Sequence, residues 1–368
     1  MALCSRIDLS ASDGANLLRL LDNFTGWDPL LVAAQAHGLG PLVYWHLSAS
    51  RAEVPPLVWR GLEGIYLRHR QANRMRIREL GAILTAFEAV GISAIVLKGA
   101  ALAHMIYPEP GLRPLGDVDI LVEKAQVKQA RKVLTTLGFV VAMASDPAAD
   151  KHLVFVKTVD GFQVVVELHY HLLAASHRTT ATLDPKINSP FAFIMGEQTA
   201  FTLGREAMLW HLCQHMVFHA DVFLPVRLIW ATDIVSFAEC FVSEIDWEYV
   251  RHHFPLVRNV LSLLQQVTPL SKAVQDRLSI SMPLHRQETW GDFRGWPRAS
   301  VAHLRQQGNS YCRILQDTFF PSTWWLRLHY GLSNTHTMLS YRFFWHPIHI
   351  LSWAAHLARE RLEFYPVA

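Results

Sequence analysis

Apolar residues recur along the chain with two different spacings. From residue 10 to residue 89 leucines and other apolar side chains are spaced as on helices, and the main interruption is a pair of prolines. Between 91 and 172 the pattern changes to short apolar runs bounded by glycines, which is typical of buried strands. Helical spacing returns after Pro190, beginning with Glu206 to Ala220. The pattern therefore predicts helices, then a compact unit of strands and helices, and then helices with no strand after about residue 172.

The middle stretch predicts a small sheet. Two apolar runs, Ile92–Leu97 and Val118–Val122, have the length and composition of buried strands. A helix with one apolar stripe is expected at 125–137. His152–Val159 and Phe162–His169 are separated by Asp-Gly, which predicts a β-hairpin. The expected fold class is α+β, with a small mixed β-sheet core between N-terminal and C-terminal helical regions.

These changes of pattern divide the chain into four regions. We expect an N-terminal helical region, the α/β core, a helical domain that completes the cleft, and a C-terminal helical region rich in aromatic residues and arginine. Their bounds are 1–89, 90–175, 176–280 and 281–368.

Composition excludes several classes of protein. The 368 residues are 51% hydrophobic and 18% charged, which is ample for a packed core and unlike a disordered chain. Four scattered cysteines exclude a small disulfide scaffold and are typical of reduced thiols in the cytoplasm. A net charge of +3 gives no strong nucleic-acid signal. We find no signal peptide and no apolar run of about 18 residues for a transmembrane segment, so a cytoplasmic protein is expected.

The segment Gly116–Val122 places two carboxylates on a hydrophobic strand. Side chains of a strand alternate between its faces, so Asp117 and Asp119 are expected to point the same way. Two such carboxylates repel each other unless a positive charge lies between them, and Mg²⁺ prefers carboxylate oxygens. The alternative is that Gly116-Asp117 is a turn and Asp119 a solvated edge residue.

Glu167 adds a third carboxylate within an otherwise apolar strand. A charge there is costly to bury without a partner. If this strand lies beside Val118–Val122, the three carboxylates form one cluster. His169 shares the face of Glu167 by the same alternation.

A glycine turn, Lys98-Gly99, lies between the first strand and a helical stretch. Such a turn exposes backbone N–H groups that can bind phosphate, and Lys98 adds a positive charge. The alternative is that Gly99 makes an ordinary tight turn, which is common.

Together these segments resemble the DNA polymerase beta-like nucleotidyltransferase superfamily. That superfamily combines a glycine turn on a first strand, D-x-D on a second, and a carboxylate on a later strand. More narrowly, the chain resembles the uncharacterised nucleotidyltransferase family over roughly residues 15–260. The motifs that carry the resemblance are Leu97-Lys98-Gly99, Tyr107, Arg113-Pro114, Gly116-Asp117-Val118-Asp119-Ile120-Leu121-Val122, Leu137-Gly138-Phe139 and Glu167-Leu168-His169.

The resemblance implies a Mg²⁺-dependent nucleotidyltransferase. It would transfer a nucleoside monophosphate from an NTP, with ATP expected, to a hydroxyl of a small molecule, peptide, protein or RNA, and pyrophosphate would leave. Asp117 and Asp119 would hold two Mg²⁺ ions and the triphosphate, and Glu167 would complete the acceptor-side metal and help the hydroxyl lose its proton. The residues implied in nucleotide and phosphate binding are Lys98, Gly99, Arg113 and Gly116.

The chain departs from the superfamily at two points. Ala100 follows Gly99 where serine or glycine is usual, and the third carboxylate is Glu167 where aspartate is commoner. The missing hydroxyl favours an alternative function, a catalytically inactive protein that binds nucleotide or serves as a scaffold. The three carboxylates argue against it, because a scaffold needs no charge cluster.

Three histidines, His211, His215 and His219, are spaced to share one helical face. They could bind zinc, pack at a domain junction, or line the active cleft. Arg227 and Asp233, on the next expected helix, could support the same cleft or form an ordinary ion pair between helices. The residues assigned to the cleft are His169, His215, His219 and Asp233.

The segment after about residue 285 combines arginines with many Trp, Phe and His residues. Core packing is the first interpretation. Contact with a membrane surface and docking of a partner protein or peptide are the alternatives.

Overall fold

A computed structural model describes most of the chain, in nine segments. These are 1–50, 52–142, 152–172, 189–221, 226–279, 301–306, 308–330, 332 and 335–364, and the first part of the expected C-terminal region, 281–300, lies outside them. The chain folds as two compact units, Met1–Leu212 with Arg227–Asp246, and Cys213–Val226 with Trp247–Ala368. The four regions expected from the sequence divide the chain differently from these two units, and that division stays a prediction.

Helices form the N-terminal part of the first unit, as the pattern predicts. They are α1 (Ala11–Leu21), α2 (Trp27–Ala36), α3 (Gly40–Ser50) and α4 (Pro56–Glu88). Proline at the start of α4 loses no hydrogen bond there, and no proline interrupts the helix afterwards. Among the described residues, the buried face of α4 is apolar except for Asn73, Arg76 and Glu79.

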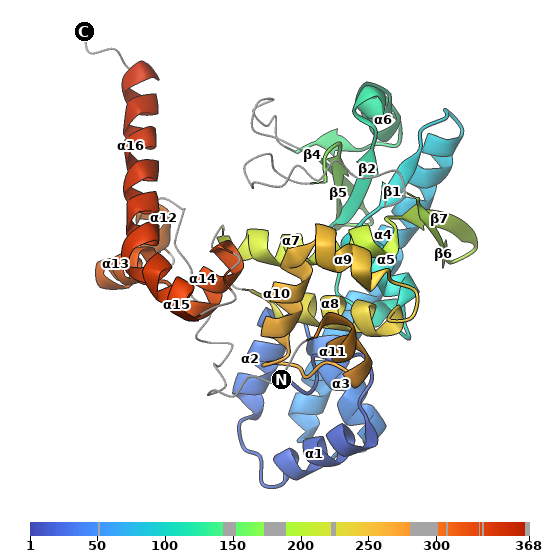
Figure 1. The fold of residues 1–368 in the computed structure, drawn as a ribbon. Coiled ribbons are helices and arrows are strands. Elements are labelled where there is room, and N and C mark those ends of the chain that lie inside the picture. The colour runs from blue at the N-terminus through green and yellow to red at the C-terminus, as the bar shows by residue number, and fades with distance from the viewer. Residues whose placement is uncertain are drawn as a thin grey trace. The chain divides into compact units, whose positions relative to one another are not determined.

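The predicted sheet is present and has five strands. They are β1 (Ala94–Val96), β2 (Val118–Val122), β3 (Val140–Val141), β4 (His152–Val159) and β5 (Phe162–His169), in the order β1-β2-β5-β4-β3. The strands β1, β2, β5 and β4 of this sheet are labelled in Figure 1. β2 and β5 are parallel, and the other neighbours are antiparallel. The hairpin β4–β5 turns at Asp160 and Gly161, both with positive φ, as a type I′ turn requires. The α+β fold class with a small mixed sheet is confirmed.

Short helices connect these strands. α5 (Lys98–Met105) and the 3₁₀ turn η1 (Pro110–Leu112) lie between β1 and β2, and η2 (Lys124–Gln126) and α6 (Val127–Thr136) follow β2. The helix expected at 125–137 is therefore confirmed.

Alternation along β2 and β5 gives the sheet two chemically different faces. Val118, Ile120, Val166 and Leu168 are fully buried on one face. Because residues of adjacent strands that are in register lie on the same face, the pairing of Asp119 with Glu167 puts both carboxylates on the other face.

A second hairpin corrects the expectation that strands end near residue 172. β6 (Phe191–Met195) and β7 (Gln198–Thr202) pair across a turn at Gly196, whose φ is +63°. Both strands alternate buried and exposed residues, but alanine, glutamine and methionine weaken the β-propensity signal. Thr202 donates a hydrogen bond of 2.6 Å from Oγ1 to the carbonyl oxygen of Val96, which attaches the hairpin to β1.

The rest of the described chain is helical. The first unit continues with α8 (Leu228–Cys240), and the boundary between the units falls within α7 (Arg205–Asp221). The helices of the second unit are α9 (Trp247–His253), α10 (Pro255–Leu264), α11 (Lys272–Leu278), α12 (Val301–Gln306), α13 (Tyr311–Phe319), α14 (Thr323–Tyr330), α15 (Thr335–Ser340), the π-helical turn η4 (Tyr341–Trp345) and α16 (His346–Phe364). Within the described residues, no helix has the length and apolar character needed to span a bilayer.

Candidate functional site

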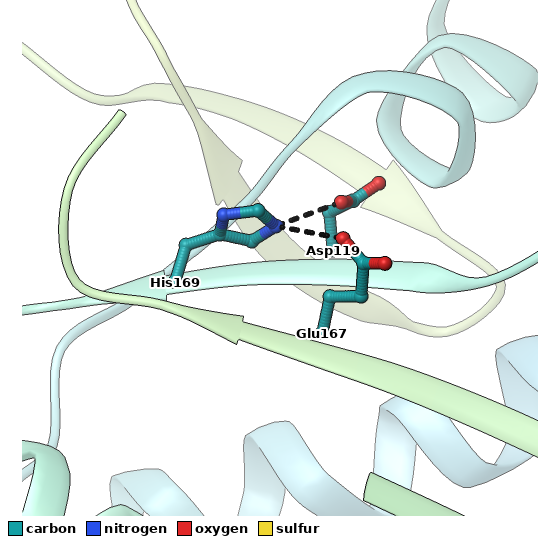
Figure 2. Close-up of side chains that lie close together, drawn as sticks. All are labelled: Asp119, Glu167 and His169. Atoms are coloured by element: carbon teal, nitrogen blue, oxygen red, sulfur yellow. Dashed lines mark hydrogen bonds and ion pairs between the residues drawn. The ribbon is translucent and has the colours of Figure 1, made fainter. Parts of the chain in front are cut away.

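Two carboxylates and one imidazole meet on the polar face of the sheet. Nε2 of His169 lies 2.9 Å from Oδ1 of Asp119 and 3.3 Å from Oε2 of Glu167 (Figure 2). One ligand atom from each residue lies within 4.8 Å of the others. The parallel register of β2 and β5 produces this arrangement, because it pairs Asp119 with Glu167 and Leu121 with His169. The sequence predicts a cluster of Asp117, Asp119 and Glu167, and the structure brings Asp119 and Glu167 together with His169.

Lys98 binds the same aspartate from the glycine turn. Its Nζ lies 2.7 Å from Oδ1 of Asp119, and the backbone N–H of Leu97 donates to the carbonyl oxygen of Asp119. Lys98 has a φ of +45°, a left-handed conformation that a residue with a side chain rarely adopts. Such local strain persists only where surrounding contacts enforce it, and here the contacts are those with Asp119.

The charges of these groups determine one another. Burial would raise the pKa of Asp119, but Lys98 and His169 hold it well below its usual range. Burial lowers the pKa of Lys98, but Asp119 and Asp117 more than compensate and raise it. Asp119 is 4% exposed, so this ion pair is screened little by water.

Asp117 lies immediately before β2 and differs from Asp119. Burial, followed by the negative charges of Asp119 and Glu167, raises the pKa of Asp117 to about 6, although Lys98 opposes the shift. Lys98 lies among the three carboxylates, and Arg113 and Arg76 also interact with the charge of Asp117. Carboxylate oxygens are typical ligands of a divalent cation, so Asp119 and Glu167, whose ligand atoms lie close to Nε2 of His169, fit the predicted metal. Asp117 is not in this group of ligand atoms.

Arg113 is held by a carboxylate of its own. Its Nη2 donates to Oδ2 of Asp233 at 2.6 Å, and the hydroxyl of Tyr107 donates to Oδ1 of Asp233 at 2.7 Å. Burial would lower the pKa of Arg113, but Asp233 raises it above the usual value. Asp233 thus forms an ion pair, with Arg113, and Arg227 donates its Nε to the carbonyl oxygen of Ala36. Phosphate binding by Arg113 and a cleft position for Asp233 stay predictions.

Asn73 of α4 fixes the loop that leads to the carboxylates. Its Nδ2 donates to the carbonyl oxygens of Pro110 and Arg113 at 2.8 Å each, and its Oδ1 accepts from the N–H of Leu115. The loop is therefore tied to the long helix on one side and to Asp233 on the other.

Gly99 is required by its contact with Arg113. A Cβ at position 99 would lie 2.6 Å from Nη1 of Arg113 and 2.9 Å from Cδ2 of Leu115. Because Asp233 holds the guanidinium, Gly99→Ala should lower the free energy of unfolding by about 1–3 kcal/mol, the usual effect of overpacking. Urea denaturation measures this difference.

The matched control for Gly99→Ala is Gly116→Ala. A Cβ at Gly116 would meet no atom within 4 Å. This variant should change stability by less than about 0.5 kcal/mol, as surface substitutions usually do. Equal losses in the two variants would contradict a specific role of the Gly99–Arg113 contact.

Sequence reasoning missed Arg76, whose side chain is 9% exposed. Its guanidinium carbon lies 4.8 Å from the centre of the Phe162 ring, and its Nε has no hydrogen-bond partner among the described residues. Burial lowers the pKa of Arg76, and Asp117 opposes the shift. The sequence contained an indication of this residue, because Asn73 and Arg76 are polar residues on the otherwise apolar stripe of the long helix.

The three histidines predicted to share one face have different surroundings. His211, in the first unit, is 3% exposed, and neither ring nitrogen has a hydrogen-bond partner in the described chain. Burial, then the charges of Lys98 and His169, lowers the pKa of His211 to about 3, so its ring is neutral. His215 and His219, in the second unit, lie with their Nε2 atoms 2.9 Å apart. Their role in the cleft stays a prediction.

Zinc was one interpretation of these histidines. Over the described residues, three metal ligands gather at one place, and these are Asp119, Glu167 and His169. The histidines of α7 are not among them.

Comparison with known proteins identifies the family. The sequence model of the family described as uncharacterised nucleotidyltransferase matches residues 24–258, more than half of the chain, so the protein belongs to this family. The resemblance expected from the motifs is thereby confirmed. No curated protein matches the chain in sequence.

Two solved structures have limited similarity to the chain. The antibiotic-resistance factor ANT(2'')-Ia, in its solution structure, is 13% identical with a TM-score of 0.38, over 52% of this chain and 96% of its own. An antigenic nucleotidyltransferase-like protein from Paracoccidioides brasiliensis is 14% identical with a TM-score of 0.33, over 54% of this chain and 96% of its own.

Proposed function

We propose that this protein is a metal-dependent nucleotidyltransferase, with Mg²⁺ as the expected ion. It would transfer a nucleoside monophosphate from an NTP, ATP being expected, to a hydroxyl of an acceptor and release pyrophosphate. The observation that carries the proposal is the pairing of Asp119 with Glu167 on one sheet face, beside a lysine from a glycine turn. Membership of the family supports the same class of reaction.

The carboxylates have different roles in this proposal. Asp117 and Asp119 would hold two divalent ions and Glu167 would hold the acceptor-side ion, and bound ions would neutralise the phosphates and the charge that develops as pyrophosphate leaves. Glu167 is half-buried and so accessible to an acceptor, whose hydroxyl proton its carboxylate could accept. His169 fixes the carboxylates of Asp119 and Glu167.

The glycine turn would bind the phosphates without a side-chain hydroxyl. The N-terminus of α5 has no side-chain cap, so the first backbone N–H groups of this helix are available as donors. Gly99 lets the chain approach closely, and Lys98 supplies a positive charge at the same turn. Ala100 occupies the position of the superfamily's serine, and the uncapped helix start offsets that loss.

Incubation with each α-labelled NTP, Mg²⁺ and host-cell extract tests the reaction. Transfer of label to any acceptor, lost in Asp119→Asn, supports the proposal. Tight nucleotide binding without label transfer would instead support the alternative of an inactive nucleotide-binding or scaffold protein, which the absent hydroxyl at position 100 favours.

Lys98→Ala should weaken nucleotide binding more than it changes the use of the acceptor. The lysine belongs to the turn itself, and its loss removes a proposed phosphate contact worth about tenfold in affinity or more, since hydrogen bonds to charged groups contribute about 1.5–3 kcal/mol. Titration with a non-hydrolysable NTP gives the affinity. An unchanged affinity would restrict Lys98 to its ion pair with Asp119.

The setting of the reaction is also part of the proposal. A cytoplasmic location is supported by the four cysteines, which are all free. The acceptor is a small molecule, peptide, protein or RNA, and docking of a partner protein or peptide is the role proposed for the C-terminal aromatic residues.

A further inference from the structure

The group of potential metal ligands is not the all-carboxylate set expected from the sequence. Its members with ligand atoms within 4.8 Å of one another are Asp119, Glu167 and His169, and Asp117 is not among them. The same nitrogen of His169, Nε2, faces Oδ1 of Asp119 and Oε2 of Glu167 (Figure 2). One imidazole nitrogen thus lies among the oxygens.

This position of His169 follows from the sheet. His169 is the last residue of β5 and is buried, and the β5 register puts it two residues beyond Glu167 on the same face. The ring cannot leave the carboxylates without breaking two polar contacts at once. The nitrogen is therefore held where a cation bound by both carboxylates would meet it.

A nitrogen ligand changes which ion the site should bind. Mg²⁺ is a hard ion that takes oxygen ligands almost exclusively and gives up its water reluctantly. Imidazole suits divalent transition metals, and affinity for a mixed nitrogen and oxygen site rises through that series from Mn²⁺ onwards. Mg²⁺ would use the oxygens of Asp119 and Glu167 alone, whereas a transition ion would gain a third protein ligand.

We propose that His169 is itself a metal ligand through Nε2, and that this site binds a divalent transition ion such as Mn²⁺ more tightly than Mg²⁺. The inference rests on the proposed function, because it concerns the ion that would serve the same reaction. It assigns to Nε2 of His169 a bond to the ion in place of the hydrogen bonds to the two carboxylates, and the proton on Nε2 leaves to solvent when the ion binds.

The test is Mn²⁺ binding to the purified full-length protein without nucleotide or acceptor, followed by electron paramagnetic resonance. Pulsed spectra should show the modulation of a directly bound ¹⁴N nucleus. Mg²⁺ should displace the bound Mn²⁺ only at a concentration at least about tenfold higher, the smallest effect usually seen when a metal site loses a supporting group. The wild-type spectrum alone decides the point if a variant fails to fold.

Two matched variants assign the nitrogen. His169→Gln offers an oxygen in place of the nitrogen, so the ¹⁴N signal should vanish and the preference for Mn²⁺ should fall. His152→Gln is the control, because that imidazole pairs with His169 across β4 and β5 and lies 4.0 Å from Glu167. It should keep both the signal and the preference.

Several outcomes would overturn the proposal. They are Mn²⁺ bound without ¹⁴N modulation, equal affinity for the two ions, failure to bind either ion, and loss of the signal in His152→Gln alone. These results are separate from the fate of the proposed function. Label transfer with Mg²⁺ and no nitrogen signal would refute the ligand role of His169 and leave the proposed function standing. A nitrogen signal without label transfer would support the ligand role and contradict the proposed function.

Discussion

Asp119→Asn should reduce label transfer by at least about a thousandfold and also destabilise the protein. The carboxylate is a proposed metal ligand and the partner of Lys98 and His169, so its loss leaves a buried ammonium without its ion-pair partner. Removing one partner of a buried ion pair usually lowers the free energy of unfolding by about 3–5 kcal/mol. Urea denaturation and the α-label assay measure the two effects.

Asp117→Asn separates the two effects of Asp119→Asn, because it should remove a proposed metal ligand without breaking the ion pair with Lys98. Transfer should again be lost, but stability at pH 8 should rise by about 1 kcal/mol, because the substitution removes a buried negative charge close to Asp119 and Glu167. From the sequence alone, both substitutions are expected to leave folding intact or to raise stability slightly. The ion pair of Lys98 with Asp119 makes the two aspartates differ. Near-normal transfer in both variants would contradict the assignment of the site.

Asp233→Asn should be the most destabilising conservative substitution proposed outside the carboxylate cluster. Asp233 is 1% exposed and binds both Arg113 and Tyr107, so the variant leaves a buried guanidinium unpaired. The free energy of unfolding should fall by about 3–5 kcal/mol. Transfer should fall too, since Arg113 packs against Gly99 at the proposed phosphate-binding turn.

Glu244→Gln provides the control for the Asp233 variant. Glu244 pairs with Arg205 in the same unit, but its side chain is 49% exposed. Solvent-exposed ion pairs contribute about 0–1 kcal/mol, so this variant should unfold almost as the wild type does. Equal losses in the two variants would show that burial of the Arg113 pair is not what makes it important.

Strand alternation was enough to predict part of the site. Asp119, Glu167 and His169 lie on one face because a rule of period two holds within each strand, and the apolar runs locate the strands. That β5 lies beside β2 was a hypothesis drawn from the isolated charge of Glu167. The strand begins only at Val118, so Asp117 lies outside the regular alternation and outside the tightest group.

Contacts between distant residues were beyond this reasoning. The bond between Arg113 and Asp233 joins positions 120 residues apart, and no local pattern connects them. Arg113 was instead predicted to bind phosphate, from its charge alone. The hairpin β6–β7 was missed for another reason, since its alternating burial depends on packing against β1 that the sequence does not reveal.

The parallel pairing of β2 with β5 also determines when a site can exist during folding. The β4–β5 hairpin closes a two-residue turn, whereas the contact of His169 with Asp119 closes a loop of 50 residues. Loop-closure entropy grows with loop length, so the strand pairing that assembles the carboxylates is entropically the more demanding of the two. A ligand bound there stabilises only chains that have completed this closure. Cation or nucleotide binding would therefore stabilise specifically the pairing of β2 with β5, which joins the residues farthest apart in sequence within this sheet.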